Sequence, residues 1–439
     1  MRRRMELATA LLLLVAGAAN RLEASGGMAP AADRERIVAA ARGGASAGTF
    51  ARHLAGEIGP RLTGTKNLAI AERWARDEFE RMGLENVRLE KWGVYQAGKG
   101  FAKRPGPRAL AVHNVVGEIR GSAKSDELVL VGAHLDSWDF AQGATDNAAG
   151  CAAILEAARS LRASGVRPAR TIRFILFTGE EQGLLGAKAY VESHPEVLAK
   201  TSAFLNMDAG TNPISGLVAT EAMRPDLSEA LAVLSRLDAS RSFTLTTVAS
   251  FALPSDCCSD GATHSRETGS SCRPAGDSGA SERAGARPPE PSCTKASKAS
   301  CATAPRADAP PGPSCSEAPG LGKAPCGSSA CARQAPNAGA GGCASDHTVF
   351  LRAGVPAFIF EQEGRADYAR THHTEFDTLD ALDLEAIQHS ALVVALAAFG
   401  IADLPERLSR ANLLSADGPD APPRCGGPSS NGAPALLSY

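Results

Sequence analysis

Short apolar runs alternate with helical stretches from residue 111 to residue 207, and this alternation restricts the fold more than any other feature of the chain. The runs are rich in β-branched residues, as strands are, and they lie at 111–119, 127–133, 171–177 and 202–207. Between them, residues 145–164 and 184–193 have helical character. Strands that alternate with helices predict an α/β fold with a mixed, mostly parallel central sheet flanked by helices.

Similar patterns occur on both sides of this region. Apolar residues spaced three and four apart predict helices at 31–42 and 69–82, and the apolar stretches near the end predict a strand at 357–360 and a helix at 382–399. We therefore expect one domain built from residues 31–254 and 344–411.

Residues 255–343 interrupt the pattern. This segment contains nine of the eleven cysteines, is rich in Pro, Gly and Ser, and has almost no large aliphatic residues. Such a composition cannot bury enough apolar surface to offset the entropy of ordering. We predict a disordered insertion, with a retained intron or a local frameshift as the alternative, and a similar disordered tail at 412–439. The pairing of the cysteines cannot be deduced from the sequence.

The N-terminus has the features of an export signal. Three arginines at positions 2–4 precede an apolar run at 7–19, which includes a small-residue cleavage motif at 16–18. We predict a signal peptide at 1–24, a secreted or periplasmic protein, and no membrane span after cleavage. A short membrane anchor or a buried helix is the alternative. Because 46 basic residues nearly balance 48 acidic ones, nucleic acid is not an expected partner.

Acidic and imidazole groups follow three of the predicted strands, and others stand at a helix start and in a later His-His pair. They are His134 and Asp136, Asp146, Glu180 and Glu181, Asp208, and His372 with His373. Ligands of an open α/β sheet bind at the carboxyl ends of its strands. Each group alone has a structural explanation, such as helix capping by Asp146 or a solvated loop position for Glu180 and Glu181. Together, several carboxylates at one point would repel each other unless cations held them.

Three carboxylates and two histidines suit a pair of zinc ions, because zinc binds imidazole nitrogen and carboxylate oxygen. Two such ions can share a bridging carboxylate and lower the pKa of a bound water. A neighbouring carboxylate that binds no metal can then accept the proton of that water. Cobalt or manganese could occupy the same groups.

Seven stretches in this order resemble the M28 family of zinc exopeptidases, and within it the carboxypeptidase Q-like group. They are residues 132–139 (GAHLDSWD), 143–147 (GATDN), 178–183 (TGEEQG), 206–210 (NMDAG), 345–347 (SDH), 353–356 (AGVP) and 370–374 (RTHHT). The resemblance implies a zinc-exopeptidase fold of the phosphorylase/hydrolase-like type. It also implies two zinc ions per chain and hydrolysis of dipeptides or short peptides.

The resemblance further implies a role for each matching residue. His134 and Asp208 would bind one zinc, Glu181 and His373 the other, and Asp146 would bridge the two. Glu180 would be the general base, and Asp136 would orient His134. His372 would then line the pocket or support the ligands, and Asp377 would be structural.

Several alternatives remain open at this point. An aminopeptidase acting on longer N-termini is the nearest alternative, and a glutaminyl cyclase with one zinc or a non-catalytic binding domain is more distant. The presence of all five ligands and the base favours the enzyme over the last two. Whether the protein forms a homodimer, and which residue type its substrate carries, cannot be read from the sequence.

Overall fold

The described strands form a nine-stranded mixed sheet in the order β2-β1-β3-β5-β4-β6-β9-β7-β8. The four central strands β5, β4, β6 and β9 are parallel, while β1, β2 and β3 on one side and β7 on the other pair antiparallel to their inner neighbours. The parallel centre with helices around it confirms the predicted fold class. The computed structural model describes residues 31–97, 100–101, 109–251 and 345–414.

The strands are β1 Glu85–Gln96, β2 Gly100–Phe101, β3 Leu110–Ile119, β4 Lys124–His134, β5 Arg170–Phe177, β6 Thr201–Asn206, β7 Ile214–Thr220, β8 Thr244–Val248 and β9 Ala357–Gln362. The α-helices are α2 Ala31–Gly43, α3 Ala47–Arg52, α4 Lys66–Arg81, α5 Ala149–Ser164, α6 Leu185–Ser193, α7 Pro195–Lys200, α8 Arg224–Ala230, α9 Asp346–Arg352, α10 Tyr368–Thr371 and α11 Leu384–Ala402. Two π-helical turns, His53–Ile58 and Ala144–Ala148, precede α4 and α5.

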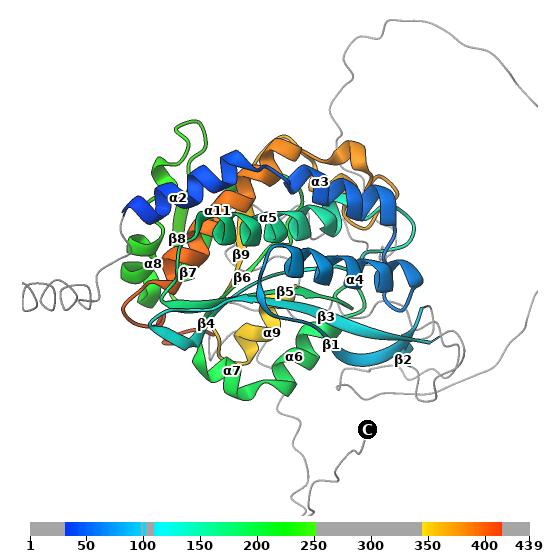
Figure 1. Cartoon of the computed structure of the whole chain (residues 1–439), viewed down its shortest axis with the longest axis horizontal. Coiled ribbons are helices and arrows are strands. Elements are labelled where there is room, and N and C mark those ends of the chain that lie inside the picture. The colour runs from blue at the N-terminus through cyan, green and yellow to red at the C-terminus, as the bar shows by residue number, and fades with distance from the viewer. Residues whose placement is uncertain (1–30, 98–99, 102–108, 252–344, 415–439) are drawn as a thin grey trace, which may run out of the picture. The chain divides into compact units, whose positions relative to one another are not determined.

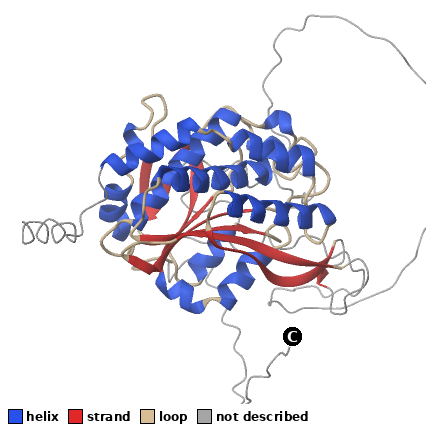
Figure 2. Ribbon diagram, in the orientation of Figure 1, coloured by secondary structure: helices blue, strands red, loops and turns tan. Residues whose placement is uncertain are grey.

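The helices cover both faces of the sheet. In Figure 1, α2, α3, α4, α5 and α11 lie on one face, and α6, α7 and α9 lie on the other. Figure 2 shows the same arrangement, with the twisted sheet between two layers of helices. The central strands are therefore buried on both sides, which explains their continuous apolar runs.

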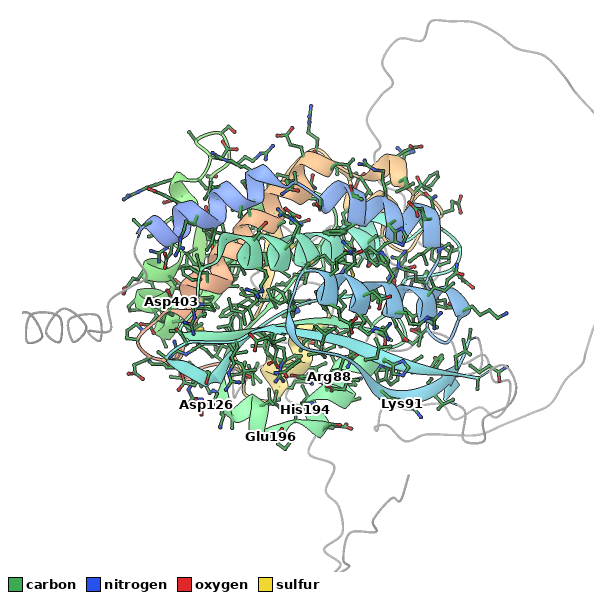
Figure 3. The ribbon with its side chains drawn as sticks, in the orientation of Figure 1. Arg88, Lys91, Asp126, His194, Glu196 and Asp403 are labelled. Atoms are coloured by element: carbon green, nitrogen blue, oxygen red, sulfur yellow. The ribbon has the colours of Figure 1, made fainter. Side chains whose placement is uncertain are left out.

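Helix α11 is a long and strongly apolar helix. By length and composition it could cross a membrane, but 78% of its most apolar window is buried inside the fold. It packs against α5 and against the central strands, so we interpret it as a core helix. Charged residues such as Lys91, Asp126 and Glu196 are exposed at the other side of the molecule (Figure 3).

Most predicted elements are present, and two differences matter. The helix expected from residue 145 begins only at Ala149, because Asp146 and Asn147 have non-helical backbone angles. Strand β1 was not predicted, since most of its side chains are only half-buried and its apolar alternation is weak.

Three predicted segments lie outside the described residues. They are the signal peptide at 1–24, the insertion at 255–343, and the tail from residue 415 onward. The first residues of the predicted tail are described: Leu413 is buried, and Leu414 forms a β-bridge with Phe251.

Candidate metal centre

The carboxyl ends of the central parallel strands bring the predicted site residues to one edge of the sheet. β4 ends at His134, which lies beside Phe177 at the end of β5, and Gly132 of β4 pairs with Asn206 at the end of β6. Glu180 and Glu181 follow β5 by a few residues, and Asp208 follows β6. The register of the sheet therefore places three separate ligand-bearing segments next to each other.

The first group of ligands contains His134, Asp146 and Asp208. The Nε2 atom of His134 lies 3.1 Å from Oδ1 of Asp146 and 3.2 Å from Oδ1 of Asp208. One ligand atom from each of the three residues lies within 4.8 Å of the others. The His134 side chain is 1% exposed, so this group is enclosed by protein.

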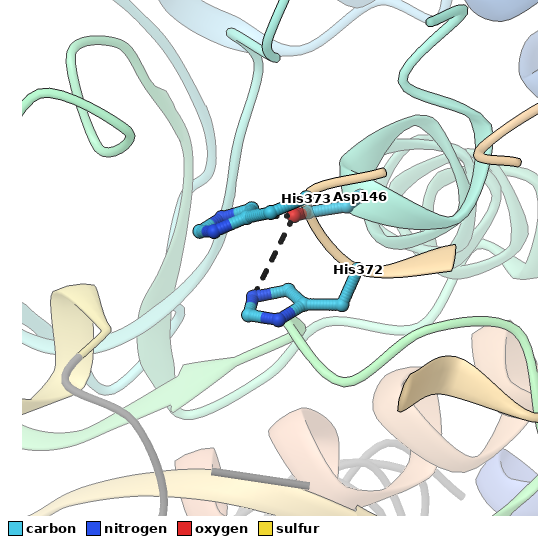
Figure 4. A group of neighbouring side chains, drawn as sticks. All are labelled: Asp146, His372 and His373. Atoms are coloured by element: carbon cyan, nitrogen blue, oxygen red, sulfur yellow. Dashed lines mark ion pairs between the residues drawn. The ribbon is translucent and has the colours of Figure 1, made fainter. Parts of the chain in front are cut away.

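The second group contains Asp146, His372 and His373, whose ligand atoms also lie within 4.8 Å of one another. Figure 4 shows both imidazoles beside the Asp146 carboxylate. Oδ2 of Asp146 is 3.4 Å from Nε2 of His373 and 3.8 Å from Nε2 of His372. Nε2 of His373 is also 3.0 Å from Oε2 of Glu181. Of the two histidines, His373 is therefore the one in contact with both carboxylates.

Asp146 belongs to both groups, and its position is fixed by Asp377. The Asp377 carboxylate accepts hydrogen bonds from the backbone N–H of Thr145 at 2.6 Å and of Asp146 at 3.2 Å, and from the Thr145 hydroxyl at 2.9 Å. These bonds hold the chain before α5 in a non-helical shape, which explains why the helix starts later than predicted. One oxygen of Asp146 faces each group, the arrangement that a carboxylate bridging two ions requires.

Asp136 supports two parts of the site at once. Its backbone carbonyl lies 3.1 Å from Nδ1 of His134, whereas its carboxylate is 3.7 Å from that atom. The carboxylate instead accepts hydrogen bonds from the backbone N–H groups of Glu180 and Glu181, both at 3.3 Å, and from the hydroxyl of Thr63 at 3.0 Å. Asp136 thus orients the turn that carries Glu180 and Glu181 as well as the imidazole.

Arg61 fixes the loop that joins the first ligand to the bridging position. Its fully buried guanidinium donates to the backbone carbonyls of Leu135, Gln142 and Gly143, at 2.8 to 3.1 Å, and to those of Leu54 and Gly59. The positive charge also lies within the field of Asp136, Asp146 and Asp377. Arg61 therefore ties the segment 135–143 to the loop before α4.

The chemistry of Glu181 fits a cation. Its side chain is 1% exposed, and in the described part of the chain neither of its carboxylate oxygens accepts a hydrogen bond. Burial raises the pKa of Glu181 well above its ordinary value, and the nearby Asp146 carboxylate adds to this. A buried carboxylate without donors is costly unless a cation or a proton neutralises it. The residues present therefore fit metal ions.

The pKa shifts of Glu180, His134 and Asp208 differ in direction and in cause. Burial raises the pKa of Glu180 well above its usual range; His134 opposes this shift, and Asp208 and Glu181 contribute to it. Burial alone would lower the pKa of His134, but the Asp208 and Glu180 carboxylates outweigh it and raise that pKa. For Asp208, His134 and a hydrogen bond from Ser345 outweigh burial and lower the pKa. A raised pKa makes the Glu180 carboxylate a better proton acceptor than an ordinary glutamate.

A small opening leads to the second group. Its lining includes Trp138, Phe140, Asp146, Glu181 and His373, and it encloses about 10 Å³, roughly the space of one water molecule. The Trp138 ring meets His373 edge-on at 5.9 Å and stacks on Phe140 at 5.8 Å. The side chain of His373 is 36% exposed, so this half of the centre faces the solvent.

All the predicted site residues gather in this region, although they come from five separate segments of the chain. Sequence reasoning missed Thr63, Arg61 and Asn206 as supporting residues, and it took Asp377 as structural without linking it to Asp146. The Gly-Pro-Arg-Leu-Thr-Gly stretch at 59–64 has the composition of a loop, but no spacing in the sequence relates it to residues about 75 positions away. Asp346 was noted only as part of a motif; it is fully buried, and neither oxygen has a hydrogen-bond partner among the described residues.

The amino-acid sequence was compared with protein-family models and with known proteins. The model of peptidase family M28 matches residues 114–263 and 322–398, more than half of the chain. Carboxypeptidase Q of Mus musculus is 40% identical over 133 residues, which are 30% of this chain and 28% of the mouse protein. The match therefore spans less than a third of that relative's length.

Two solved structures share the fold. A peptidase M28 precursor from Shewanella amazonensis SB2B superimposes with a TM-score of 0.56 at 18% identity, covering 86% of this chain and 97% of that one. The glutaminyl cyclase of Macrostomum lignano gives 0.52 at 13% identity, also covering 86% and 97%. Proteins of different activity thus share this architecture, so any assignment of activity has to rest on the site residues.

Proposed function

Because the chain belongs to peptidase family M28, we propose that it is a two-zinc metallo-exopeptidase that hydrolyses dipeptides or short peptides. The observation that carries this proposal is the position of Asp146, whose two oxygens face two separate groups of ligands. One shared carboxylate between two histidine-containing groups suits a pair of ions better than a single one.

The proposed ligands follow from these contacts. His134 and Asp208 would hold one zinc ion, Glu181 and His373 the other, and Asp146 would bridge them. The contact of His373 with both Asp146 and Glu181 supports its choice over His372, which approaches Asp146 only at 3.8 Å. Asp136 would keep His134 oriented through its backbone carbonyl.

When bound, the two ions would polarise the scissile carbonyl and make a water molecule acidic enough to react at neutral pH. Glu180 would accept a proton from the attacking water as the new C–O bond forms. It would then donate this proton to the leaving amine as the amide C–N bond breaks. Its raised pKa and its place beside the ligand turn support this role.

Substrate range and location are the further parts of the proposal. The resemblance of residues 132–139 to the carboxypeptidase Q-like group supports dipeptides or short peptides as substrates. An aminopeptidase acting on longer N-termini is the second candidate. We also propose export to the periplasm or the extracellular space, on the basis of the N-terminal sequence, and leave a homodimer open.

The test is metal content and dipeptide hydrolysis by the purified protein beside Glu180→Gln. We expect about two zinc ions per chain in both, with kcat about 10²- to 10⁴-fold lower in the variant. Glu192→Gln is the matched control, because Glu192 is exposed on α6, and it should behave as the wild type. A folded wild-type protein without bound zinc or activity would overturn the proposal.

Peptides blocked at one terminus separate the two candidates. A dipeptidase or carboxypeptidase should lose its substrate when the C-terminus is amidated. An aminopeptidase should still hydrolyse the C-terminally amidated peptide, but it should not hydrolyse a peptide whose N-terminus is acetylated.

A further inference from the structure

A serine from a distant segment contacts one of the proposed ligands. Ser345 precedes α9, and its hydroxyl donates to Oδ2 of Asp208 at 2.5 Å. The Ser345 hydroxyl oxygen in turn accepts a hydrogen bond from Nδ2 of Asn206 at 2.8 Å. Ser345 is 3% exposed and Asn206 is fully buried, so water does not compete well for these bonds.

The two oxygens of Asp208 therefore have different partners. Oδ2 is engaged by the Ser345 hydroxyl, while Oδ1 lies 3.2 Å from Nε2 of His134. The Asn206 amide restricts the rotation of the Ser345 hydroxyl, because the hydroxyl accepts a hydrogen bond from Asn206 and donates its proton to Asp208. This chain of two hydrogen bonds leaves Oδ1 directed toward the first ligand group.

Ser345 occupies the N-cap position of α9, where a serine hydroxyl ordinarily accepts a bond from the first turn of the helix. In this helix, which is fully described, the hydroxyl makes no such bond. The first turn is instead closed by the serine backbone carbonyl, which accepts from the N–H of Thr348 at 2.9 Å and from its hydroxyl at 2.8 Å. The side chain of Ser345 is thus directed to Asp208 and does not cap its own helix.

We propose that Ser345 is a positioning residue for metal binding: its hydroxyl, held by Asn206, fixes Asp208 so that Oδ1 points to the ion shared with His134. The inference rests on the proposed function, because it takes Asp208 as a ligand. It assigns Ser345 no contact with the substrate or with the metal. Residues that orient a ligand in this way commonly change metal affinity about 10- to 100-fold when removed.

The experiment measures zinc affinity and stoichiometry of the full chain by competition with a chromogenic chelator. Ser345→Ala removes the hydroxyl, Ser345→Thr retains it, and Thr348→Val is the matched control. Thr348 is equally buried in the same turn, but among the described residues its hydroxyl bonds only to the Ser345 carbonyl. We expect Ser345→Ala to weaken one of two zinc sites about 10- to 100-fold, with the other site unchanged. Ser345→Thr and Thr348→Val should bind like the wild type.

Two results would overturn the inference. One is wild-type affinity at both sites in Ser345→Ala, and the other is an equal loss in Thr348→Val, which would point to helix packing. If Ser345→Ala does not fold, Ser345→Cys replaces it with the same criteria, because a thiol is a similar-sized but weak donor. A wild-type protein that binds no zinc would instead contradict the proposed function itself, so the two failures are distinguishable.

Discussion

The two halves of the candidate metal centre are held by the protein in different ways. His134 is the last residue of β4, and Asp208 follows the end of β6. Their side chains are 1% and 10% exposed, and the chain itself provides each with a polar partner. In the other half, the side chain of His373 is 36% exposed and its backbone has a positive φ of 56°. Its partner Glu181 is buried, but no hydrogen bond from the described chain reaches its oxygens.

This difference suggests that the protein positions the ligands of one half, whereas a bound ion would help to position those of the other. In the half built on strand ends, the protein itself provides a polar partner for each ligand. The half built on the two turns depends more on the ion, which would replace the missing donors to Glu181. A left-handed backbone at a non-glycine residue beside such a group is typical of functional sites.

The largest effect should come from the residue that both halves share. Asp146→Ala removes the only oxygen pair that faces both ligand groups in the described chain. We expect zinc content to fall from about two ions to less than one, and kcat/KM to fall at least about 10³-fold, since several kcal/mol of transition-state stabilisation is lost. Elemental analysis and dipeptide hydrolysis measure this, with Asp139→Ala, an exposed position in the preceding loop, as the control. Retention of one full ion would argue against a bridge.

The second prediction compares the two histidines in the metal-free protein. His134→Ala leaves the buried carboxylates of Asp146 and Asp208 without their cationic partner, and we expect a loss of about 3–5 kcal/mol in the free energy of unfolding. His373→Ala removes a side chain that is 36% exposed, and it should cost less, about 1 kcal/mol. Urea unfolding with a chelator present measures both. Equal losses would mean that the two halves are equally preorganised.

The third prediction concerns the support of the bridging carboxylate. Asp377→Ala leaves the buried N–H groups of Thr145 and Asp146 without their acceptor, and it frees the turn before α5. Zinc affinity should fall about 10- to 100-fold, by the same ligand-orienting effect. Asp380→Ala, an exposed change in the same segment, serves as the control. If both variants bind zinc as the wild type does, Asp377 has only a structural role.

The smallest effect is a pH dependence of the metal-free protein. Folding raises the pKa of Glu181 and of His134, so both contribute stability at low pH that is lost as pH rises through their folded-state pKa values. Asp208 acts in the opposite direction because its pKa is lowered, but its contribution is complete above about pH 5, since the unfolded-state pKa of an aspartate is about 3.9.

We therefore expect the metal-free protein to be less stable at pH 8 than at pH 5. Zinc should reverse the trend, because it competes with protons for the same groups. Urea unfolding at the two pH values, with zinc or with a chelator, measures this. In Glu181→Gln the metal-free slope should become smaller, and an unchanged slope would assign the effect to other groups.

The sequence was sufficient to predict much of the site because several of the candidate ligands lie at or just after the ends of strands. In a parallel sheet these ends meet at one edge whatever the intervening helices do, so His134, Glu181 and Asp208 could be grouped without coordinates. The order of the motifs then indicated the family, which the family model confirms over more than half of the chain.

Elements with weak patterns were not predictable in the same way. Strand β1 carries charged residues between its apolar ones and is only half-buried, so its alternation did not indicate a strand. The shape of residues 144–148 was also missed, because the helical composition of this stretch is overridden by bonds to Asp377, more than 230 residues later in the chain.

By itself, then, the sequence determined the class of fold and the types of side chain at the strand ends, since both follow from local periodicity and chain order. Only the tertiary structure decided how these side chains are held. The bonds of Asp377 to the turn at Asp146, of Thr63 to Asp136, and of Ser345 to Asp208 each join residues at least 70 positions apart. Such bonds depend on the packing of helices and loops around the sheet, and no local pattern in the chain encodes that packing.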